Sequence, residues 1–291
     1  MSNTKTVVGI SISGGGMLGI GPAYFMSRLE VLLGKKMSDV GFAFAGTSTG
    51  SIIAAGLASG MKAMDIYDLY DKNLQKIFTE FSFFKKLTRK GCASYDNAYL
   101  KSILQKHFKG KMCDFKKPIF IPSVIRNREN QDKIFDSWDK EVDQWFAILT
   151  SCSAPKYFDS PEKDGLWYAD GGLWMNNPVI ALGAGVTKKC GLRPDQFRIL
   201  AFDTGMTRSN SEYTGQKSLV GVADEILDNW VAHSGLGANF IASAYHDVMT
   251  LSPVAKKEIK MDDVKRKADV VEIWDKYFET MGEKVATWLA L

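Results

Sequence analysis

A short polar turn holds the serine whose setting in the sequence most favours chemistry. Gly46-Thr47-Ser48-Thr49-Gly50 lies where the apolar run FAFAG, residues 42–46, gives way to an apolar helical pattern. A G-x-S-x-G turn between a strand and a helix strains the serine backbone and exposes its hydroxyl at the helix N-terminus, where the helix dipole favours developing negative charge. Helix capping by a serine needs no glycine on both sides. We therefore predict Ser48 as a nucleophile, with Gly46 and Gly50 shaping its turn.

A second glycine-rich segment, SGGGMLGIG from residue 13 to 21, follows the first apolar run. Nucleophilic attack on a carbonyl creates an oxyanion, and the loop glycines Gly14, Gly15 and Gly16 can direct backbone N–H groups toward it. The segment also fits the dinucleotide-binding pattern G-x-G-x-x-G. That interpretation needs an acidic residue at the end of the next strand, whereas Asp39 precedes that strand. An oxyanion hole is the better interpretation.

Activation of Ser48 requires a base. Asp170 follows the short run Leu166 to Ala169 and precedes two glycines, and a carboxylate held there could accept the serine proton directly. A Ser-Asp-His triad could instead combine Ser48 and Asp170 with His233 or His246, although neither histidine has a recognisable catalytic setting. Both arrangements stay open at this point.

Three motifs in this order resemble those of the patatin-like phospholipases: residues 13–19 (SGGGMLG), residues 46–50 (GTSTG) and residues 170–172 (DGG). TSCSAPKYFDS, residues 150–160, and Asn176-Asn177-Pro178 are similar to the segments on either side of the family's catalytic acid. The resemblance implies a lipid acyl hydrolase with a serine-aspartate dyad, no catalytic histidine and an acyl-enzyme intermediate. Leu18 departs from the family pattern, which usually has a basic residue there.

Alternating strand and helix patterns predict the elements that must position these motifs. Strands are expected at residues 7–13, 42–46, 118–125, 133–138, 166–169 and 197–202, and helices near 21–36, 51–59, 64–78, 97–108, 142–151, 178–189, 222–233 and 270–291. This alternation predicts a single three-layer α/β domain with a central, mostly parallel sheet between helices. The motifs occupy residues 7–178, and a helical part is expected over about 205–291.

Composition restricts the function further. The net charge of +4 is too small to suggest nucleic-acid binding by itself, and the four cysteines are far apart. We therefore expect neither nucleic-acid binding, a disulfide framework, a metal site nor a cofactor. The N-terminal residues do not resemble a signal peptide, and polar residues and glycines interrupt the apolar segment 42–58. A cytoplasmic protein with peripheral membrane association is expected.

A phospholipid or related acyl-ester lipid at a membrane surface is the expected partner, with an unidentified activator as a further possibility. Four phenylalanines, at positions 78, 81, 83 and 84, precede the basic residues 85, 86, 89 and 90. Aromatic residues beside basic ones suit an anionic membrane, so Phe81, Phe83, Phe84, Lys85 and Lys86 are candidates for membrane docking. Phenylalanines packed in the core are the alternative. A non-catalytic lipid- or protein-binding module on the same scaffold also remains open.

Overall fold

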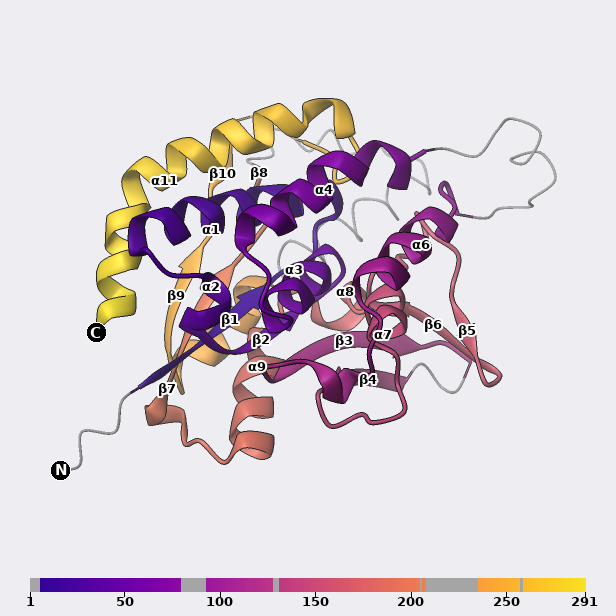
Figure 1. The fold of residues 1–291 in the computed structure, drawn as a ribbon, viewed down its shortest axis with the longest axis horizontal. Helices are drawn as coiled ribbons and strands as arrows, with labels where there is room; N and C mark the ends of the chain where they lie inside the picture. The colour runs from indigo at the N-terminus through magenta and orange to yellow at the C-terminus, as the bar shows by residue number, and fades with distance from the viewer. Residues whose placement is uncertain (1–5, 80–92, 128–130, 205, 208–234, 257–258) are drawn as a thin grey trace, which may run out of the picture.

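The structure, a computed structural model, describes residues 6–79, 93–127, 131–204, 206–207, 235–256 and 259–291. A twisted sheet runs through its centre in the order β5-β6-β3-β2-β1-β7-β9, and β4 pairs with β3 (Figure 1). These strands span Val7–Ile12 (β1), Gly41–Gly46 (β2), Ile119–Ile125 (β3), Gln131–Asp136 (β4), Glu162–Lys163 (β5), Leu166–Asp170 (β6), Phe197–Phe202 (β7) and Asp247–Leu251 (β9). A separate two-stranded pairing joins β8, Met206–Thr207, to β10, Val254–Ala255.

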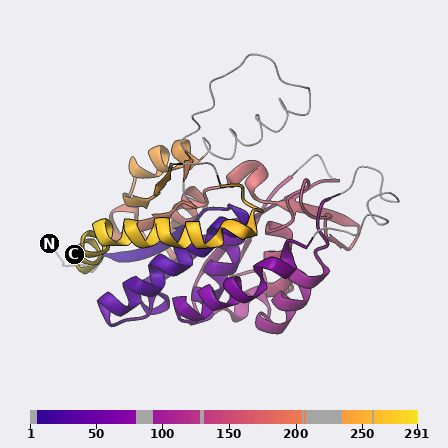
Figure 2. The same ribbon diagram turned by 90° about the horizontal axis from the view of Figure 1, so that it is seen from above.

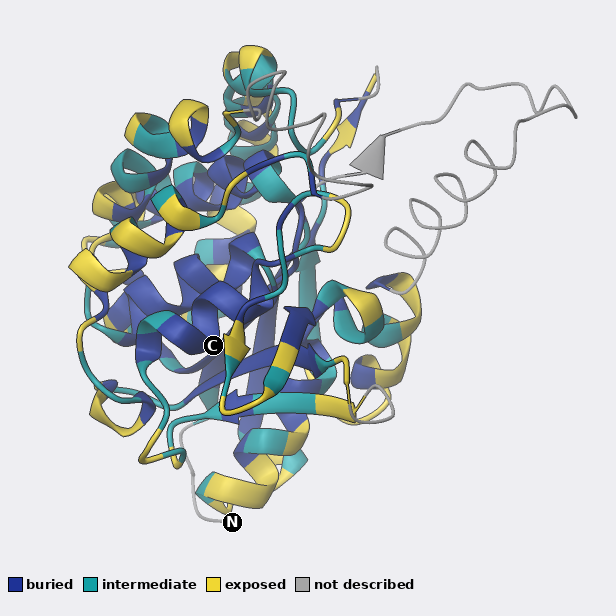
Figure 3. Ribbon diagram, turned by 90° about the vertical axis from the view of Figure 1, so that its right-hand side faces the viewer, coloured by how far each residue is buried: buried dark blue, intermediate teal, exposed yellow. Residues whose placement is uncertain are grey.

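The sheet has a parallel part and an antiparallel part. β3, β2, β1, β7 and β9 run parallel to one another. β4 and β6 both pair antiparallel with β3, and β5 pairs antiparallel with β6. The central strands are almost wholly buried, as expected where helices cover both faces of a parallel sheet (Figure 3).

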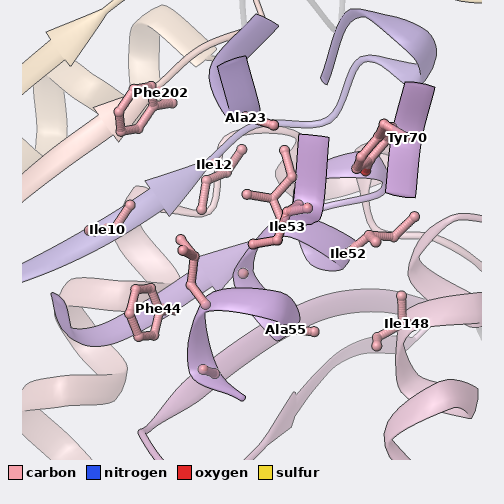
Figure 4. Packing of buried hydrophobic residues seen from close by; sticks show 14 of the residues in the cluster. Ile10, Ile12, Ala23, Phe44, Ile52, Ile53, Ala55, Tyr70, Ile148 and Phe202 are labelled. Atoms are coloured by element: carbon pink, nitrogen blue, oxygen red, sulfur yellow. The ribbon is translucent and has the colours of Figure 1, made fainter. Parts of the chain in front are cut away.

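Most of the helices cover one face of the sheet. They are α1 (Ile20–Leu33), α3 (Thr49–Ala58), α4 (Ala63–Ile77), α6 (Ala98–His107), α7 (Gln144–Ser151) and α11 (Lys267–Ala290), and the one-turn helix α2 (Met37–Val40) connects α1 to β2. Ile10 and Ile12 of β1 pack there against Ile53 of α3, and Phe202 closes the cluster on the β7 side (Figure 4). α11 lies along α1, with its Trp274 buried (Figure 2).

The opposite face is covered by α9, Val179–Gly185, and by the helical turn that follows it, Val186–Cys190. Val179 and Leu182 of α9 pack against Ala43, Ala45 and other residues of β2, β3 and β7. The small alanines of β2 allow α9 to approach the sheet closely. The short helix α8, Gly172–Met175, precedes α9 and lies at the end of β6.

The predicted α/β architecture, with a central sheet between helices, is confirmed. The structure differs from the sequence prediction in two places. Residues 205–291, expected to be helical, also contain β9, which pairs with β7 at the sheet edge. β4 and β6 reverse the direction of the sheet beside β3, which the expected βαβ pattern did not include. The helix predicted at 222–233 lies outside the described residues.

Candidate active site

Two strands converge on one edge of β3 and bring Ser48 and Asp170 together. β2 pairs with the start of β3, at Ile119 and Phe120, and β6 pairs with its end, residues 123–125. β4 occupies the other edge along the same stretch, so β2 and β6 must share one edge. Because β2 is parallel to β3 and β6 is antiparallel, their carboxyl ends point toward each other.

Pro122 lies between the two ladders on this edge of β3. Proline has no N–H to donate to a neighbouring strand, so it suits the gap where one ladder ends and the next begins. Gly171 packs directly against it, since a Cβ on Gly171 would lie 2.3 Å from the Pro122 carbonyl oxygen. The glycine after the acid therefore allows the chain to leave β6 across β3.

The serine turn has the strained geometry of a nucleophile elbow. Ser48 has φ 52° and ψ −127°, a region that residues with a side chain rarely adopt. A Cβ on Gly46 would lie 2.1 Å from the Gly50 carbonyl oxygen, and one on Gly50 would lie 2.2 Å from that of Ile12. Ser48 stands at the N-cap of α3 but its side chain makes no capping hydrogen bond. Helix capping therefore does not explain why a serine occupies position 48.

Hydrogen bonds from the end of α7 and from α3 hold the serine backbone. The Ser48 N–H donates to Ser151 Oγ at 3.0 Å. The Ser48 carbonyl accepts from Ser51 Oγ at 2.6 Å and from Cys152 Sγ at 3.1 Å. Ser151 and Cys152 lie in the segment 150–160, which is similar to a family segment, but their contacts with the Ser48 backbone were not predicted. Small polar residues at the end of an apolar helix were the available signal.

Asp170 is the last residue of β6 and is only 4% exposed. Burial raises the pKa of its carboxyl to about 7, although the hydrogen bond that it accepts from the Gly172 N–H and the nearby Ser48 side chain oppose the rise. The Gly172 N–H lies 2.7 Å from Asp170 Oδ1. A carboxyl with a pKa near neutrality, beside a serine hydroxyl, can take and return a proton near neutral pH.

The glycine loop approaches the serine from the end of β1, but its three amides are not equivalent. A Cβ on Gly14 would lie 3.1 Å from the Cβ of Ser48. The Gly14 N–H, however, donates to the Asn176 carbonyl at 3.1 Å, so the prediction that it faces an oxyanion is corrected. The N–H groups of Gly15 and Gly16 have no acceptor within the described part of the chain. Gly16 has φ +57° and packs against Met261, which explains why a glycine is needed there.

The histidines that the structure describes lie away from this site. His246 Nδ1 is 3.3 Å from the carbonyl oxygen of Phe197, the first residue of β7, whereas the glycine loop lies beyond that strand's last residue. Five strand steps of about 3.3 Å each separate the two ends by about 17 Å. His107 is exposed at the end of α6. His233 lies in an undescribed segment.

Leu18 and the candidates for membrane docking are the remaining residues named from the sequence. Leu18 packs partly buried against the main core rather than toward the solvent. The docking candidates Phe81, Phe83, Phe84, Lys85 and Lys86 all fall within residues 80–92, outside the described ranges. Phe78, next to that segment, packs against the rings of Tyr95 and Phe158, as a core residue does.

Several further observations concern disulfides, metals and membranes. Cys113, Cys152 and Cys190 are free cysteines. Over the ranges that the structure describes, no three His, Cys, Asp or Glu side chains gather as metal ligands would. No helix in those ranges combines the length and apolar character needed to cross a bilayer.

Comparison with known proteins finds relatives over much of the chain. The chain is 29% identical over 191 residues to a cGAMP-activated phospholipase of Pseudomonas aeruginosa, which covers 62% of this chain and 56% of the relative. It is 27% identical over 272 residues to Patatin-like protein 2 of Arabidopsis thaliana, covering 77% of this chain and 65% of the relative. A match to an intracellular phospholipase A2 of Caenorhabditis elegans is 28% identical over 186 residues, or 60% of this chain and 16% of the relative.

The chain thus spans at most about two thirds of the length of these relatives. Among solved structures, human GIVD cytosolic phospholipase A2 has the same fold, with a TM-score of 0.50 and 12% identity, covering all of this chain and 59% of the human one. The patatin-like phospholipase family model matches residues 10–182, from the first strand through the serine turn and the acid to α9. The chain belongs to the patatin-like phospholipase family.

Proposed function

We propose that this protein is a phospholipase A-type acyl hydrolase in which Ser48 and Asp170 form a catalytic dyad. The observation that carries the proposal is the meeting of the strained Ser48 turn with the buried Asp170 carboxyl where β2 and β6 converge on β3. Burial raises the pKa of that carboxyl to about 7. The serine sits on a strained turn beside a glycine loop, and both described histidines lie elsewhere. These features together favour a dyad over a Ser-His-Asp triad.

In the acylation step, Ser48 Oγ attacks the carbonyl carbon of the ester while its proton passes to Asp170. The carbonyl oxygen becomes an oxyanion, and the N–H groups of Gly15 and Gly16 donate to it. The tetrahedral intermediate then collapses and breaks the bond to the alcohol oxygen. That oxygen takes the proton from Asp170 and leaves as the lysophospholipid, and the acyl chain stays esterified to Ser48.

Deacylation repeats these steps with water in place of the alcohol. Asp170 takes a proton from the attacking water, and the same amides hold the second oxyanion. Ser48 Oγ leaves with the proton, and the fatty acid is released. A carboxyl with a pKa near 7 suits both directions of proton transfer, because its two protonation states are similar in free energy at neutral pH.

The family and the relatives that carry the name phospholipase support the substrate class. A glycerophospholipid ester at a membrane surface is the proposed substrate. The P. aeruginosa relative is described as cGAMP-activated, so an activator remains part of the proposal and assays should be run with and without cGAMP.

The test is fatty-acid release from phosphatidylcholine and phosphatidylglycerol vesicles, measured by mass spectrometry, with fluorophosphonate labelling in parallel. The parent protein is expected to release fatty acid and to be labelled at Ser48. Ser48→Ala should abolish both, and Ser102→Ala, which removes an exposed hydroxyl on α6, should retain labelling. Vesicle binding by a parent protein that neither reacts with fluorophosphonate nor releases fatty acid would instead support a non-catalytic module.

A further inference from the structure

The peptide group that joins Gly14 to Gly15 is held by side chains from two distant segments. Thr204 Oγ1 donates to the Gly14 carbonyl oxygen at 2.9 Å, and Asn176 Nδ2 donates to the same oxygen at 3.4 Å. Thr204 contributes the shorter of these bonds. It lies just after β7, in a part of the sequence that none of the motifs covers.

The position of this carbonyl determines the direction of the next N–H group. The Gly14–Gly15 peptide bond, like the others in the described ranges, is trans, and in a trans peptide the C=O and N–H groups point in opposite directions within one plane. Fixing the Gly14 carbonyl toward Thr204 therefore turns the Gly15 N–H away from Thr204. The Gly15 N–H is one of the two loop amides with no acceptor in the described ranges, so it is a candidate oxyanion donor.

Thr204 is itself held in place by the sheet. β1 and β7 are paired through Ile12 and Phe202, and the Ser13 N–H donates to the Phe202 carbonyl at 2.9 Å. The segments that follow β1 and β7 therefore leave the sheet side by side, which brings residue 204 next to residue 14.

Further observations place Thr204 tightly against the loop. Thr204 is 7% exposed, and its N–H donates to Asp203 Oδ1 at 2.9 Å. Its side chain lies so close to Gly15 that a Cβ there would be 2.3 Å from Thr204 Oγ1. The hydroxyl has little freedom to point elsewhere.

We propose that Thr204 is a positioning residue of the oxyanion hole, which acts by orienting the Gly14–Gly15 peptide. This inference rests on the proposed acyl hydrolase function. The hydroxyl does not touch the reacting atoms. Its removal frees the peptide to rotate, so the Gly15 N–H is no longer fixed where negative charge develops in the transition state.

Two substitutions at this position separate the hydroxyl from the shape of the side chain. Thr204→Val keeps the branched shape and removes the donor, whereas Thr204→Ser keeps the donor and removes a methyl group. With p-nitrophenyl butyrate as substrate, Thr204→Val is expected to lower kcat by about 10- to 100-fold with KM nearly unchanged, because the lost interaction acts in the transition state. Thr204→Ser is expected to stay within about threefold of the parent kcat.

A fluorophosphonate titration of active sites accompanies the kinetics, so that kcat is expressed per reactive Ser48. A merely structural role would lower the fraction of reactive protein and leave kcat per site unchanged. That result, or an equal loss of kcat in Thr204→Ser, would overturn the inference. If Thr204→Val does not fold, the smaller Thr204→Ala gives the same comparison. Failure of the proposed function itself would show differently, as a parent protein with no Ser48-dependent hydrolysis.

Discussion

Replacing Asp170 by asparagine should remove activity and stabilise the fold at the same time. Burial raises the pKa of this carboxyl from its ordinary value of 3.8 to about 7, so the folded protein binds its proton more tightly than the unfolded chain does. The free energy of unfolding must therefore fall as the pH rises from about 4 to about 7, and it levels off above that. Asparagine has nearly the same shape and does not ionise, so it removes this dependence.

The size of the effect follows from the two pKa values. One pKa unit corresponds to about 1.4 kcal/mol, so the full shift is equivalent to about 4 kcal/mol, of which about 3 kcal/mol lies above pH 5. The stability of Asp170→Asn relative to the parent should therefore be about 3 kcal/mol greater at pH 8 than at pH 5. Hydrolysis should fall by about 10²- to 10⁴-fold, the usual contribution of a general base.

Urea denaturation at pH 5 and pH 8 measures this difference, because titrations elsewhere in the protein cancel between the two variants. Asp132→Asn is the control, since this aspartate is exposed on β4. Its effect should be the same at both pH values. A stability difference for Asp170→Asn that widens by less than about 1 kcal/mol would refute the assignment of a buried carboxyl with a raised pKa.

Three other perturbations test the site. The kcat/KM for p-nitrophenyl butyrate should fall about tenfold per pH unit below pH 7, because Asp170 must be deprotonated to accept the serine proton; a profile that is flat from pH 5 to 7 would exclude it as the base. Gly50→Ala should lower the free energy of unfolding by about 1–3 kcal/mol or more, since its Cβ would meet a carbonyl oxygen at 2.2 Å. Gly237→Ala, where a Cβ meets nothing within 4 Å, should be neutral or stabilising by up to about 1 kcal/mol in the same denaturant titration. His246→Ala should keep the parental kcat, and loss of activity in that variant while it remains folded would favour a triad instead.

The candidate catalytic residues could be predicted because their motifs are local. The backbone strain at Ser48 and the crowding at its two glycines arise within a few residues of the turn, so the sequence carries the signal directly. Asp170 was recognisable for the same reason, at the end of a short strand and before two glycines.

Features that depend on distant partners could not be predicted in this way. Residue patterns indicate a strand but not its direction, so the reversal at β4 and β6 was missed. The glycine loop suggested three free amides, yet the Gly14 N–H is used by the carbonyl of Asn176, a residue far along the chain. β9 was missed because its sequence, DVMTL, mixes polar and apolar residues without a clear alternation.

The two halves of the proposed dyad are supported unequally by the sheet. Ser48 follows β2, which lies between β1 and β3 near the middle of the sheet, whereas Asp170 ends β6, which pairs with β3 over only three residue pairs and beyond that with the two-residue β5. We expect opening of this peripheral ladder to require less free energy than global unfolding and to separate acid from nucleophile while most of the molecule stays native. Hydrolytic activity would then depend on whether the β3–β6 ladder is formed. Mild denaturant would abolish activity reversibly before the main unfolding transition.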